Sequence, residues 1–432
     1  MADVNILPPT ASKRQVLFAS LIGTTIEFFD FYIYATAAVL VFPALFFPGD
    51  DAAAGMLKSF ATFAIAFFAR PVGALVFGHF GDRIGRKATL VVALMTMGLS
   101  TVAIGLLPTY AQAGVLAPLL LALCRFGQGL GLGGEWGGAV LLATENAPAG
   151  RKAWYGMFPQ LGAPIGFILS TTTFIVLTSV MADADFLAWG WRIPFIASAV
   201  LVLVGLWVRL KITETPEFSR AMEREERVRA PAVTLFRHHA GAVVLGALGG
   251  ATTFVIFYLL TVWALGWATT TMGLTREEVL PIQLIGVLFF AAFIPTAALA
   301  ADRFGQLTML ILASIAIGLF GLTFAPLFSM GETGLLIFFS IGFALMGCTY
   351  GPLSAAMARP FPAAVRYTGA SMAFNLSGIL GASAAPYVAQ MLAERYGLSA
   401  VGLYLAGMAA LTTLALWAMT RLKNEEGAGA EG

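Results

Sequence analysis

The chain has 432 residues, of which 59% are hydrophobic and only 11% are charged, and its formal net charge is +2. Soluble domains carry about 25% charged residues, so this composition excludes a soluble globular protein and indicates a chain solvated mostly by lipid. The small net charge also gives no indication of a nucleic-acid-binding surface. The two cysteines, Cys124 and Cys348, lie in separate apolar runs and therefore predict neither a disulfide framework nor a metal site.

Apolar runs long enough to cross a bilayer, which takes about 20 residues, recur along the whole chain. The first run contains Glu27 and Asp30 and is too long to be a cleavable signal. We expect an all-α membrane protein with twelve transmembrane helices in two six-helix bundles. The predicted spans are 16–42, 58–79, 88–107, 115–144, 153–178, 189–210, 240–265, 281–301, 307–327, 334–357, 366–391 and 399–420.

Lysine and arginine are enriched in cytoplasmic loops, so their positions predict the orientation of the spans. With both termini inside, most of the 25 basic residues, including Arg209, fall in inner loops and tails. The basic residues that fall outside are Lys58, Arg192, Arg276 and Arg395. We therefore predict a multi-pass protein of a bacterial-type inner membrane with both termini in the cytoplasm.

The two halves of the chain share sequence landmarks. Gly81-Asp82-Arg83-Ile84-Gly85-Arg86 follows the second span, and Ala301-Asp302-Arg303-Phe304-Gly305-Gln306 follows the eighth. Cys124-Arg125-Phe126-Gly127 in the fourth span corresponds to Cys348-Thr349-Tyr350-Gly351 in the tenth. We expect an N-terminal bundle over 1–210, a partly helical cytoplasmic linker over 211–239 and a C-terminal bundle over 240–432. Repeats of this kind place the substrate site near the membrane centre, between the halves.

Two motifs resemble signatures of the major facilitator superfamily. They are Gly78-x-x-x-Asp82-Arg83-x-Gly85-Arg86-Lys87, which is similar to its loop 2–3 signature, and the run from Arg125 and Gln128 to Glu135 in the fourth span. Narrower motifs resemble the metabolite:proton symporter branch: Ile26-Glu27-Phe28-Phe29-Asp30-Phe31, Ala69-Arg70-Pro71-Val72-Gly73, Thr215-Pro216-Glu217-Phe218 and Val365-Arg366-Tyr367-Thr368-Gly369. That branch includes permeases for shikimate, α-ketoglutarate, citrate, and proline or betaine. One departure is Gln306, where the second-half loop usually carries a basic residue.

Four charged residues fall near the predicted membrane centre, all in the first half: Glu27, Asp30, Arg70 and Arg125. A charge there costs about 2.5–3.5 kcal/mol on insertion scales, which makes each one a candidate for function. Protonation of one acid would free an arginine, whose planar fork suits a carboxylate. The sugar-porter branch looks similar, with a span-1 aspartate and a span-4 arginine linked to proton coupling. The alternative is that Glu27–Arg70 and Asp30–Arg125 are fixed ion pairs that only hold the spans together.

Further candidates divide into three roles. Glu135 is a candidate for proton exit, although a buried structural acid is an equal alternative. The polar substrate contacts that we expect are Tyr34, Gln128, Tyr258, Trp263, Gln283, Tyr350 and Asn375, each with a packing role as the alternative. We expect Glu145 to form a cytoplasmic charge cluster with Arg83 and Arg151. The complete set of predicted gating residues is Asp82, Arg83, Arg86, Glu145, Arg151, Asp302, Arg303 and Arg366.

The resemblance and the buried charges together predict a proton-coupled symporter that imports a small carboxylate-bearing metabolite by alternating access. Antiport or uncoupled transport, and uptake of a zwitterion such as proline or betaine, stay open. An enzyme or a sensor is a third class, but the chain shows no nucleophile–base set and no phosphate-binding loop. We therefore expect no enzyme activity and no cofactor, with the proton gradient as the energy source. The expected partners of a monomer are the organic anion or zwitterion, protons and the lipid bilayer.

Overall fold

The computed structural model describes residues 13–49, 52–211, 230–382 and 385–421, and nearly all of them are helical. Eleven helices in this part are long and apolar enough to cross a membrane, and a twelfth apolar helix, Gln306–Gly321, is shorter. The predicted class, an all-α membrane protein with twelve spans, is confirmed. The predicted helical part of the linker up to residue 229 lies outside the described residues.

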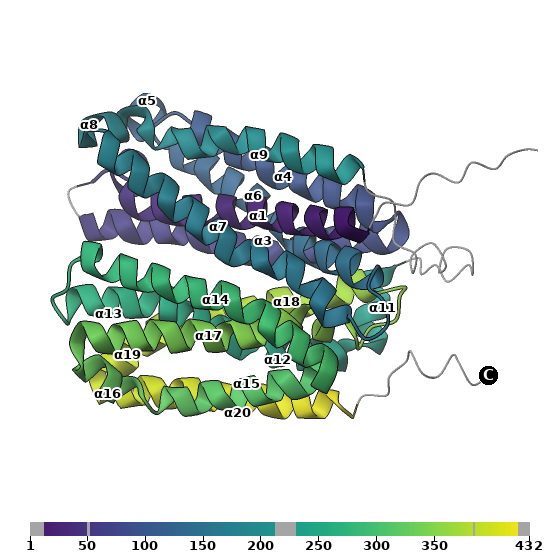
Figure 1. Ribbon diagram of the computed structural model, residues 1–432. Coiled ribbons are helices and arrows are strands. Elements are labelled where there is room, and N and C mark those ends of the chain that lie inside the picture. The colour runs from purple at the N-terminus through teal and green to yellow at the C-terminus, as the bar shows by residue number, and fades with distance from the viewer. Residues whose placement is uncertain (1–12, 50–51, 212–229, 383–384, 422–432) are drawn as a thin grey trace, which may run out of the picture.

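The first half of the chain forms one bundle, drawn from purple to teal in the upper part of Figure 1. Its membrane-crossing helices are separated by short helices and turns. The elements are α1 (Lys13–Leu40), α2 (Phe42–Phe46), α3 (Ala52–Arg83), α4 (Arg86–Leu106), α5 (Tyr110–Ala113), α6 (Leu116–Glu145), α7 (Lys152–Val180), α8 (Asp183–Asp185), the π-helical segment η1 (Phe186–Gly190) and α9 (Arg192–Leu210).

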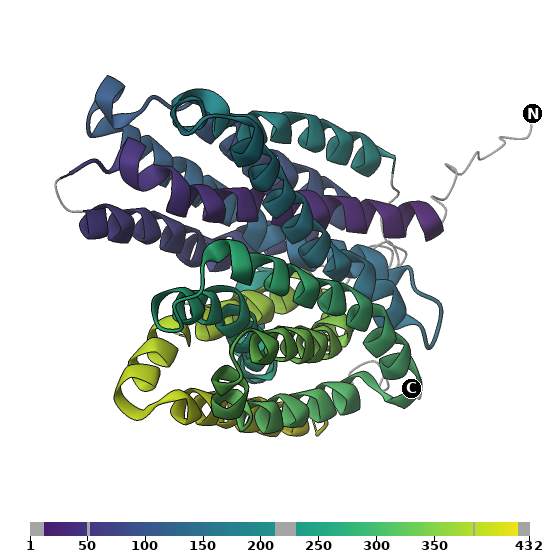
Figure 2. The same ribbon diagram turned by 60° about the vertical axis from the view of Figure 1, so that its left-hand side comes forward.

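The second half forms the other bundle, drawn in green and yellow below the first, and both views keep the two apart. Figure 2 shows this division from the side. The elements are α11 (Pro231–His238), α12 (Ala240–Tyr258), the π-helical segment η2 (Leu259–Trp263), α13 (Ala264–Thr270), α14 (Arg276–Phe304), α15 (Gln306–Gly321), α16 (Phe324–Ser329), α17 (Gly331–Ala358), α18 (Arg366–Ala382), α19 (Ala385–Tyr396) and α20 (Leu398–Met419).

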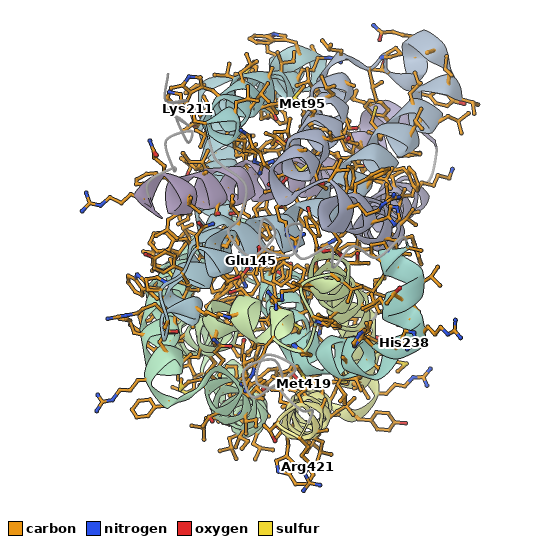
Figure 3. The ribbon with its side chains drawn as sticks, turned by 90° about the vertical axis from the view of Figure 1, so that its right-hand side faces the viewer. Met95, Glu145, Lys211, His238, Met419 and Arg421 are labelled. Carbon is orange, nitrogen blue, oxygen red and sulfur yellow. The ribbon has the colours of Figure 1, made fainter. Side chains whose placement is uncertain are left out.

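One end of the molecule, which we call the α11 end, carries α11, the start of α1 and the end of α20. Figure 3 looks onto this end, with Glu145 between the bundles, Lys211 on the first bundle and Arg421 on the second. The ends of α3 and α14, where the two related loop motifs follow, lie at the same end because both helices run toward it.

The predicted span at 307–327 is divided in the structure. α15 has 16 residues and ends at Gly321, and α16 begins at Phe324 after a turn. At 1.5 Å per residue, 16 residues rise about 24 Å, which is less than the roughly 30 Å hydrocarbon core. α15 and α16 together therefore complete the crossing that the sequence predicted as one helix.

Glycines on α6 let its neighbours approach closely and so position the charged side chains of the first bundle. A Cβ atom at Gly129 would lie 2.6 Å from the Ala66 carbonyl oxygen of α3. One at Gly131 would lie 2.7 Å from the Ala93 carbonyl oxygen of α4. Small residues at helix interfaces permit such backbone contact inside a membrane. α6 is thereby fixed between α3 and α4.

Candidate functional site

A small cavity of about 40 Å³ lies between the two bundles, near the middle of the helices that line it. This volume leaves room for a few water molecules. Its wall is mainly aromatic, and Arg70 is the one charged side chain among the described lining residues. The lining residues are Phe28, Phe31, Tyr32, Arg70, Leu132, Ala163, Thr253, Phe254, Phe257, Tyr258, Met346, Tyr350 and Phe374.

Arg70 is anchored from the second bundle. Its Nε atom donates to Asn375 Oδ1 at 2.8 Å, and Asn375 Nδ2 donates to the Gly133 carbonyl oxygen at 3.1 Å. The guanidinium carbon lies 5.9 Å from the ring centres of Phe67 and Phe374. In the described part of the chain the bond to Asn375 is the one hydrogen bond that Arg70 makes. Its two terminal nitrogens therefore remain available to a group in the cavity.

Both acids of α1 are buried, Glu27 with 1% and Asp30 with 0% of its surface exposed. Asp30 accepts a hydrogen bond from Ser198 Oγ at 2.6 Å. Glu27 Oε2 and Asp30 Oδ2 have no hydrogen-bond partner among the described residues. The guanidinium groups whose charges act on Glu27 are those of Arg70 and Arg209.

Arg125 is not among the residues that line the cavity and lies against aromatic rings of α1. Its guanidinium carbon is 3.9 Å from the ring centre of Tyr34 and 5.1 Å from that of Phe31. Arg125 Nη1 donates to Gln128 Oε1 at 3.0 Å, and Gln128 Nε2 donates to Thr101 Oγ1 at 2.8 Å. Three predicted substrate contacts, Arg125, Gln128 and Tyr34, thus form a buried group beside the cavity instead of lining it.

Neither predicted ion pair is a direct contact between the described side chains. Asp30 bonds to Ser198 rather than to Arg125, and Arg70 bonds to Asn375 rather than to Glu27. The physical reason is that each arginine has a competing partner. The rings and amide of its own bundle hold Arg125, and an amide from the other bundle holds Arg70.

A buried ion pair that was not expected from the sequence lies nearer the α11 end. Arg209, which the positive-inside pattern places in an inner loop, is only 2% exposed. It pairs with both carboxylate oxygens of Glu135, with Nη1 to Oε2 at 2.9 Å. Nη1 also donates to the Leu90 carbonyl oxygen at 2.6 Å. The positive-inside pattern places an arginine at this helix end correctly, but it cannot indicate that the side chain folds back into the bundle.

Two aspartates join the bundles at the α11 end in a reciprocal way. Asp82, from the end of α3, accepts hydrogen bonds from the backbone nitrogens of Tyr367 and Thr368 at 3.1 and 3.0 Å, and from Thr368 Oγ1 at 2.7 Å. Asp302, from the end of α14, accepts bonds from the nitrogens of Ala153 and Trp154 at 2.8 and 3.0 Å. Each carboxylate therefore binds the first turn of a helix in the opposite bundle, where the helix dipole favours negative charge.

Glu145 lies at the centre of the α11 end, as Figure 3 shows. It pairs with Arg86 of the first bundle at 3.5 Å and with Arg366 of the second at 3.6 Å. The predicted partners were Arg83 and Arg151, but both are exposed, and Arg83 contacts His79 instead. Glu145 is thus paired with two arginines that pack inward, Arg86 of α4 and Arg366 of α18. The two predicted arginines extend into water instead.

Arg303 is likewise exposed and lies over the ring of Phe304, 5.3 Å from its centre. Five of the predicted gating residues take part in contacts between the two bundles. They are Asp82, Arg86, Asp302 and the ion pair of Glu145 with Arg366.

Two predicted substrate contacts, Gln283 and Trp263, are not among the residues that line the cavity and pack between helices of the second bundle. Gln283 is 2% exposed, and its Nε2 donates to the carbonyl oxygens of Leu260 and Thr261 at 3.0 and 3.3 Å. These carbonyls belong to the π-helical segment η2, where backbone groups depart from the α-helical pattern. Trp263 packs against the rings of Trp267, Phe324 and Phe328. Tyr258, Tyr350 and Arg70 do line the cavity.

Most of the aromatic wall was not predicted, although the sequence contains a signal for it. Phe28-x-x-Phe31-Tyr32 in the first span and Phe254-x-x-Phe257-Tyr258 in the seventh have the same spacing. Both sets line the cavity, and the rings of Tyr32 and Phe257 meet across the bundles at 6.5 Å. In this register Thr253 stands where the first half has Glu27. Alignment of spans one and seven would therefore have indicated both the aromatic box and its charge asymmetry.

Known proteins resemble this chain in sequence over nearly its whole length. The profile of the sugar (and other) transporter family matches residues 16–237. An inner membrane metabolite transport protein of Escherichia coli is 54% identical and covers 94% of each chain. The shikimate transporter of Escherichia coli is 36% identical over 88% of this chain and 87% of its own. The proline/betaine transporter of Salmonella typhimurium is 31% identical over 91% of this chain and 80% of its own.

A solved structure shares the fold. A proton:xylose symporter of the major facilitator superfamily, bound to 6-bromo-6-deoxy-D-glucose, superposes with a TM-score of 0.78. The alignment covers 96% of this chain and 98% of the symporter, at 17% sequence identity. The fold of this chain is therefore one that a solved structure also has.

Proposed function

Because this chain belongs to the sugar (and other) transporter family of the major facilitator superfamily, we propose that it imports a small carboxylate-bearing metabolite together with protons. The chain is a membrane transport protein, and its relatives carry small organic substrates. The observation that carries the proposal is Arg70, the charged side chain on an aromatic cavity between the bundles.

The chemistry of the cavity supports an anion with an apolar body. Arg70 keeps its terminal nitrogens for the cavity because Asn375 binds only Nε. A guanidinium fork binds a carboxylate through two parallel hydrogen bonds. The rings around it supply flat apolar surface, and the hydroxyl groups of Tyr32, Tyr258 and Tyr350 are candidates to bind polar substituents.

The buried acids support proton coupling. Ionised carboxylates without full hydrogen bonding are costly inside a protein. Glu27 Oε2 and Asp30 Oδ2 have no hydrogen-bond partner among the described residues. A proton on either acid lowers this cost. When a substrate carboxylate binds Arg70, Glu27 loses part of the positive field that stabilises its charge, and so proton uptake accompanies substrate binding.

Orientation and location complete the proposal. We assign the α11 end to the cytoplasm, since the basic loops fall there by the positive-inside rule. The inner membrane metabolite transport protein of Escherichia coli, which is 54% identical to this chain, supports the same location here. The contacts of Asp82, Asp302 and Glu145 close the α11 end, so we assign this structure to a state closed toward the cytoplasm.

A zwitterion with a methylated ammonium group is the second candidate substrate. Aromatic cages bind quaternary ammonium groups through cation–π attraction. The cavity that Arg70 lines is also lined by the rings of Phe28, Tyr32, Phe254 and Phe257. These rings would surround the ammonium group of the zwitterion, and Arg70 would bind its carboxylate. A site for such a zwitterion would take up glycine betaine better than shikimate. A site for a carboxylate with an uncharged body would take up shikimate better than glycine betaine.

The test is uptake by purified protein in proteoliposomes that enclose a pH-sensitive dye. Shikimate and glycine betaine serve as probes, with an imposed gradient that is acidic outside. We expect accumulation of one probe with acidification of the lumen, abolished in Arg70→Gln and unchanged in Lys58→Gln, an exposed residue of the same helix. Accumulation without proton entry would overturn the coupling. Lumen alkalinisation would indicate exchange, and equal uptake by Arg70→Gln would overturn the anion site.

A further inference from the structure

Arg209 is placed between two buried acids from different helices. It pairs with Glu135 of α6 through both carboxylate oxygens. On α1, a Cβ atom at Gly23 would lie 3.1 Å from Arg209 Cζ and 3.1 Å from Glu135 Oε1, so the backbone of α1 presses directly on this pair. Glu27 stands one turn further along the same face of α1. The charge of Glu27 acts on Arg209, as that of Arg209 acts on Glu27.

The other side of the same α6 segment holds the second bundle. The Gly133 carbonyl oxygen accepts from Asn375 Nδ2 at 3.1 Å, and that of Gly134 accepts from the Tyr367 hydroxyl at 2.7 Å. Next along the helix, the ring of Trp136 stacks on Phe374 with 3.6 Å between ring centres. Glu135 therefore sits within the very turn of α6 that seals the bundles between the cavity and the α11 end.

The charges in this region do not balance once a substrate anion is present. Without substrate, Glu27 and Glu135 face two guanidinium groups, Arg70 and Arg209. A substrate carboxylate on Arg70 would leave Arg209 to serve both acids. The group of Glu27, Glu135 and Arg209 would then carry one excess negative charge in a dry interior, and a single proton would cancel it.

We propose that Arg209 is the positioning residue that links the acid at the cavity, Glu27, to the acid behind the inner seal, Glu135. This inference rests on the proposed proton-coupled function and assigns its route through the first bundle. When the proton taken up at Glu27 passes to Glu135, Arg209 is released from Glu135 and turns toward the Glu27 carboxylate, which is charged again. The α6 turn from Gly133 to Trp136 is then no longer held by the ion pair between Glu135 and Arg209, and its contacts with α18 weaken.

The direction of the pH effect follows from this exchange. Acid neutralises Glu135, so acid favours separation of the bundles at the α11 end, and neutral pH favours the closed form seen here. The charged and titratable side chains that act electrostatically on Arg209 or on Glu27 come from four helices. They are Glu27 of α1, Arg70 of α3, Tyr350 of α17 and Tyr367 of α18. From α4 the contact is the Leu90 carbonyl oxygen.

The test measures the inner seal directly and needs no substrate. Spin labels are placed at Ala88→Cys and Gly241→Cys, exposed positions on the two bundles at the α11 end, after Cys124→Ser and Cys348→Ser remove the native thiols. Pulsed electron resonance then gives the distance distribution of the full chain in nanodiscs at acidic and neutral pH. We expect the open-to-closed ratio to rise on acidification by a factor typical of coupled sites, about 5–150-fold.

The variants separate a linking role from a structural one. In Arg209→Gln we expect the pH dependence of the ratio to be lost, and in Arg209→Lys to be partly kept. We expect Glu135→Gln to show at neutral pH the ratio that the parent protein shows in acid. The control, Lys211→Gln, changes an exposed charge next to the same helix end and should leave the pH dependence intact.

Two results would overturn the inference. The first is a parent protein whose distances do not depend on pH. The second is an Arg209→Gln variant that melts at lower temperature yet keeps the full pH dependence, because a merely structural pair would behave in that way. Neither result bears on whether shikimate or glycine betaine drives proton entry, so the failure of the substrate proposal and the failure of this one are told apart.

Discussion

Replacement of Asp82 by asparagine is expected to weaken closure of the α11 end. Asp82 accepts hydrogen bonds from the backbone nitrogens of Tyr367 and Thr368 and from the Thr368 hydroxyl, all in the opposite bundle. These contacts exist only while the bundles meet at this end. Asparagine has nearly the same shape but lacks the charge and one acceptor oxygen, and its amide group faces a backbone donor.

The size of the effect follows from the contacts that are lost. Hydrogen bonds to a charged group contribute about 1.5–3 kcal/mol and neutral ones about 0.5–1.5 kcal/mol. One bond is lost in Asp82→Asn, the remaining two become neutral, and the favourable charge at the start of α18 disappears. We expect a net cost to the closed state of about 2 kcal/mol, which corresponds to an increase of about 30-fold in the open-to-closed ratio.

The assay is the distance between labels at Ala88→Cys and Gly241→Cys, measured at one pH. Glu278→Gln is the matched control, since Glu278 also binds the start of a helix, through Thr275, but within one bundle. We expect it to leave the distance distribution unchanged. If Asp82→Asn gives the parent distribution with an unchanged melting temperature, the reasoning that these bonds hold the end closed is refuted.

Three further substitutions test other parts of the structure. Arg70→Lys keeps the charge but loses the bond to Asn375 and the planar fork, so affinity for the transported probe should fall at least about tenfold by calorimetry. Gln283→Leu leaves the buried Leu260 carbonyl without its donor, so the free energy of unfolding should fall by about 1–3 kcal/mol in denaturant titrations, with transport retained. Trp136→Leu removes an aromatic stack across the bundles, worth about 0.5–1.5 kcal/mol, and should raise the open-to-closed ratio about two- to twelvefold in the label assay.

The architecture could be predicted because a bilayer imposes one simple rule on the sequence. Every spanning segment must satisfy its own backbone hydrogen bonds, so each apolar run of sufficient length becomes a helix. The related motifs at Asp82 and Asp302 also indicate that the loops after the second and the eighth span lie at the same end of the molecule. The turn between Gly321 and Phe324 could not be predicted, because it divides a run that is apolar throughout.

The candidate site could be predicted in composition but not in pairing. Glu27, Asp30, Arg70 and Arg125 are all buried as the spans imply, with exposures from 0 to 8%. The sequence could not show which partner each one contacts, since an arginine side chain is long enough to reach several helices. The bond of Arg70 to Asn375 joins residues 305 positions apart, and no local pattern encodes it.

The sequence by itself determined that this chain crosses a membrane, that its halves are related, and that acids and guanidinium groups lie in its interior. These properties depend on the kind of residue and on its distance along one helix. The tertiary structure decided that Arg209 turns inward to Glu135, that Arg125 rests on aromatic rings, and that Arg70 alone among the described arginines lines the cavity. Those outcomes depend on how closely neighbouring helices pack, and the glycines at Gly23 and Gly129 set that spacing only once the partner helices are in place.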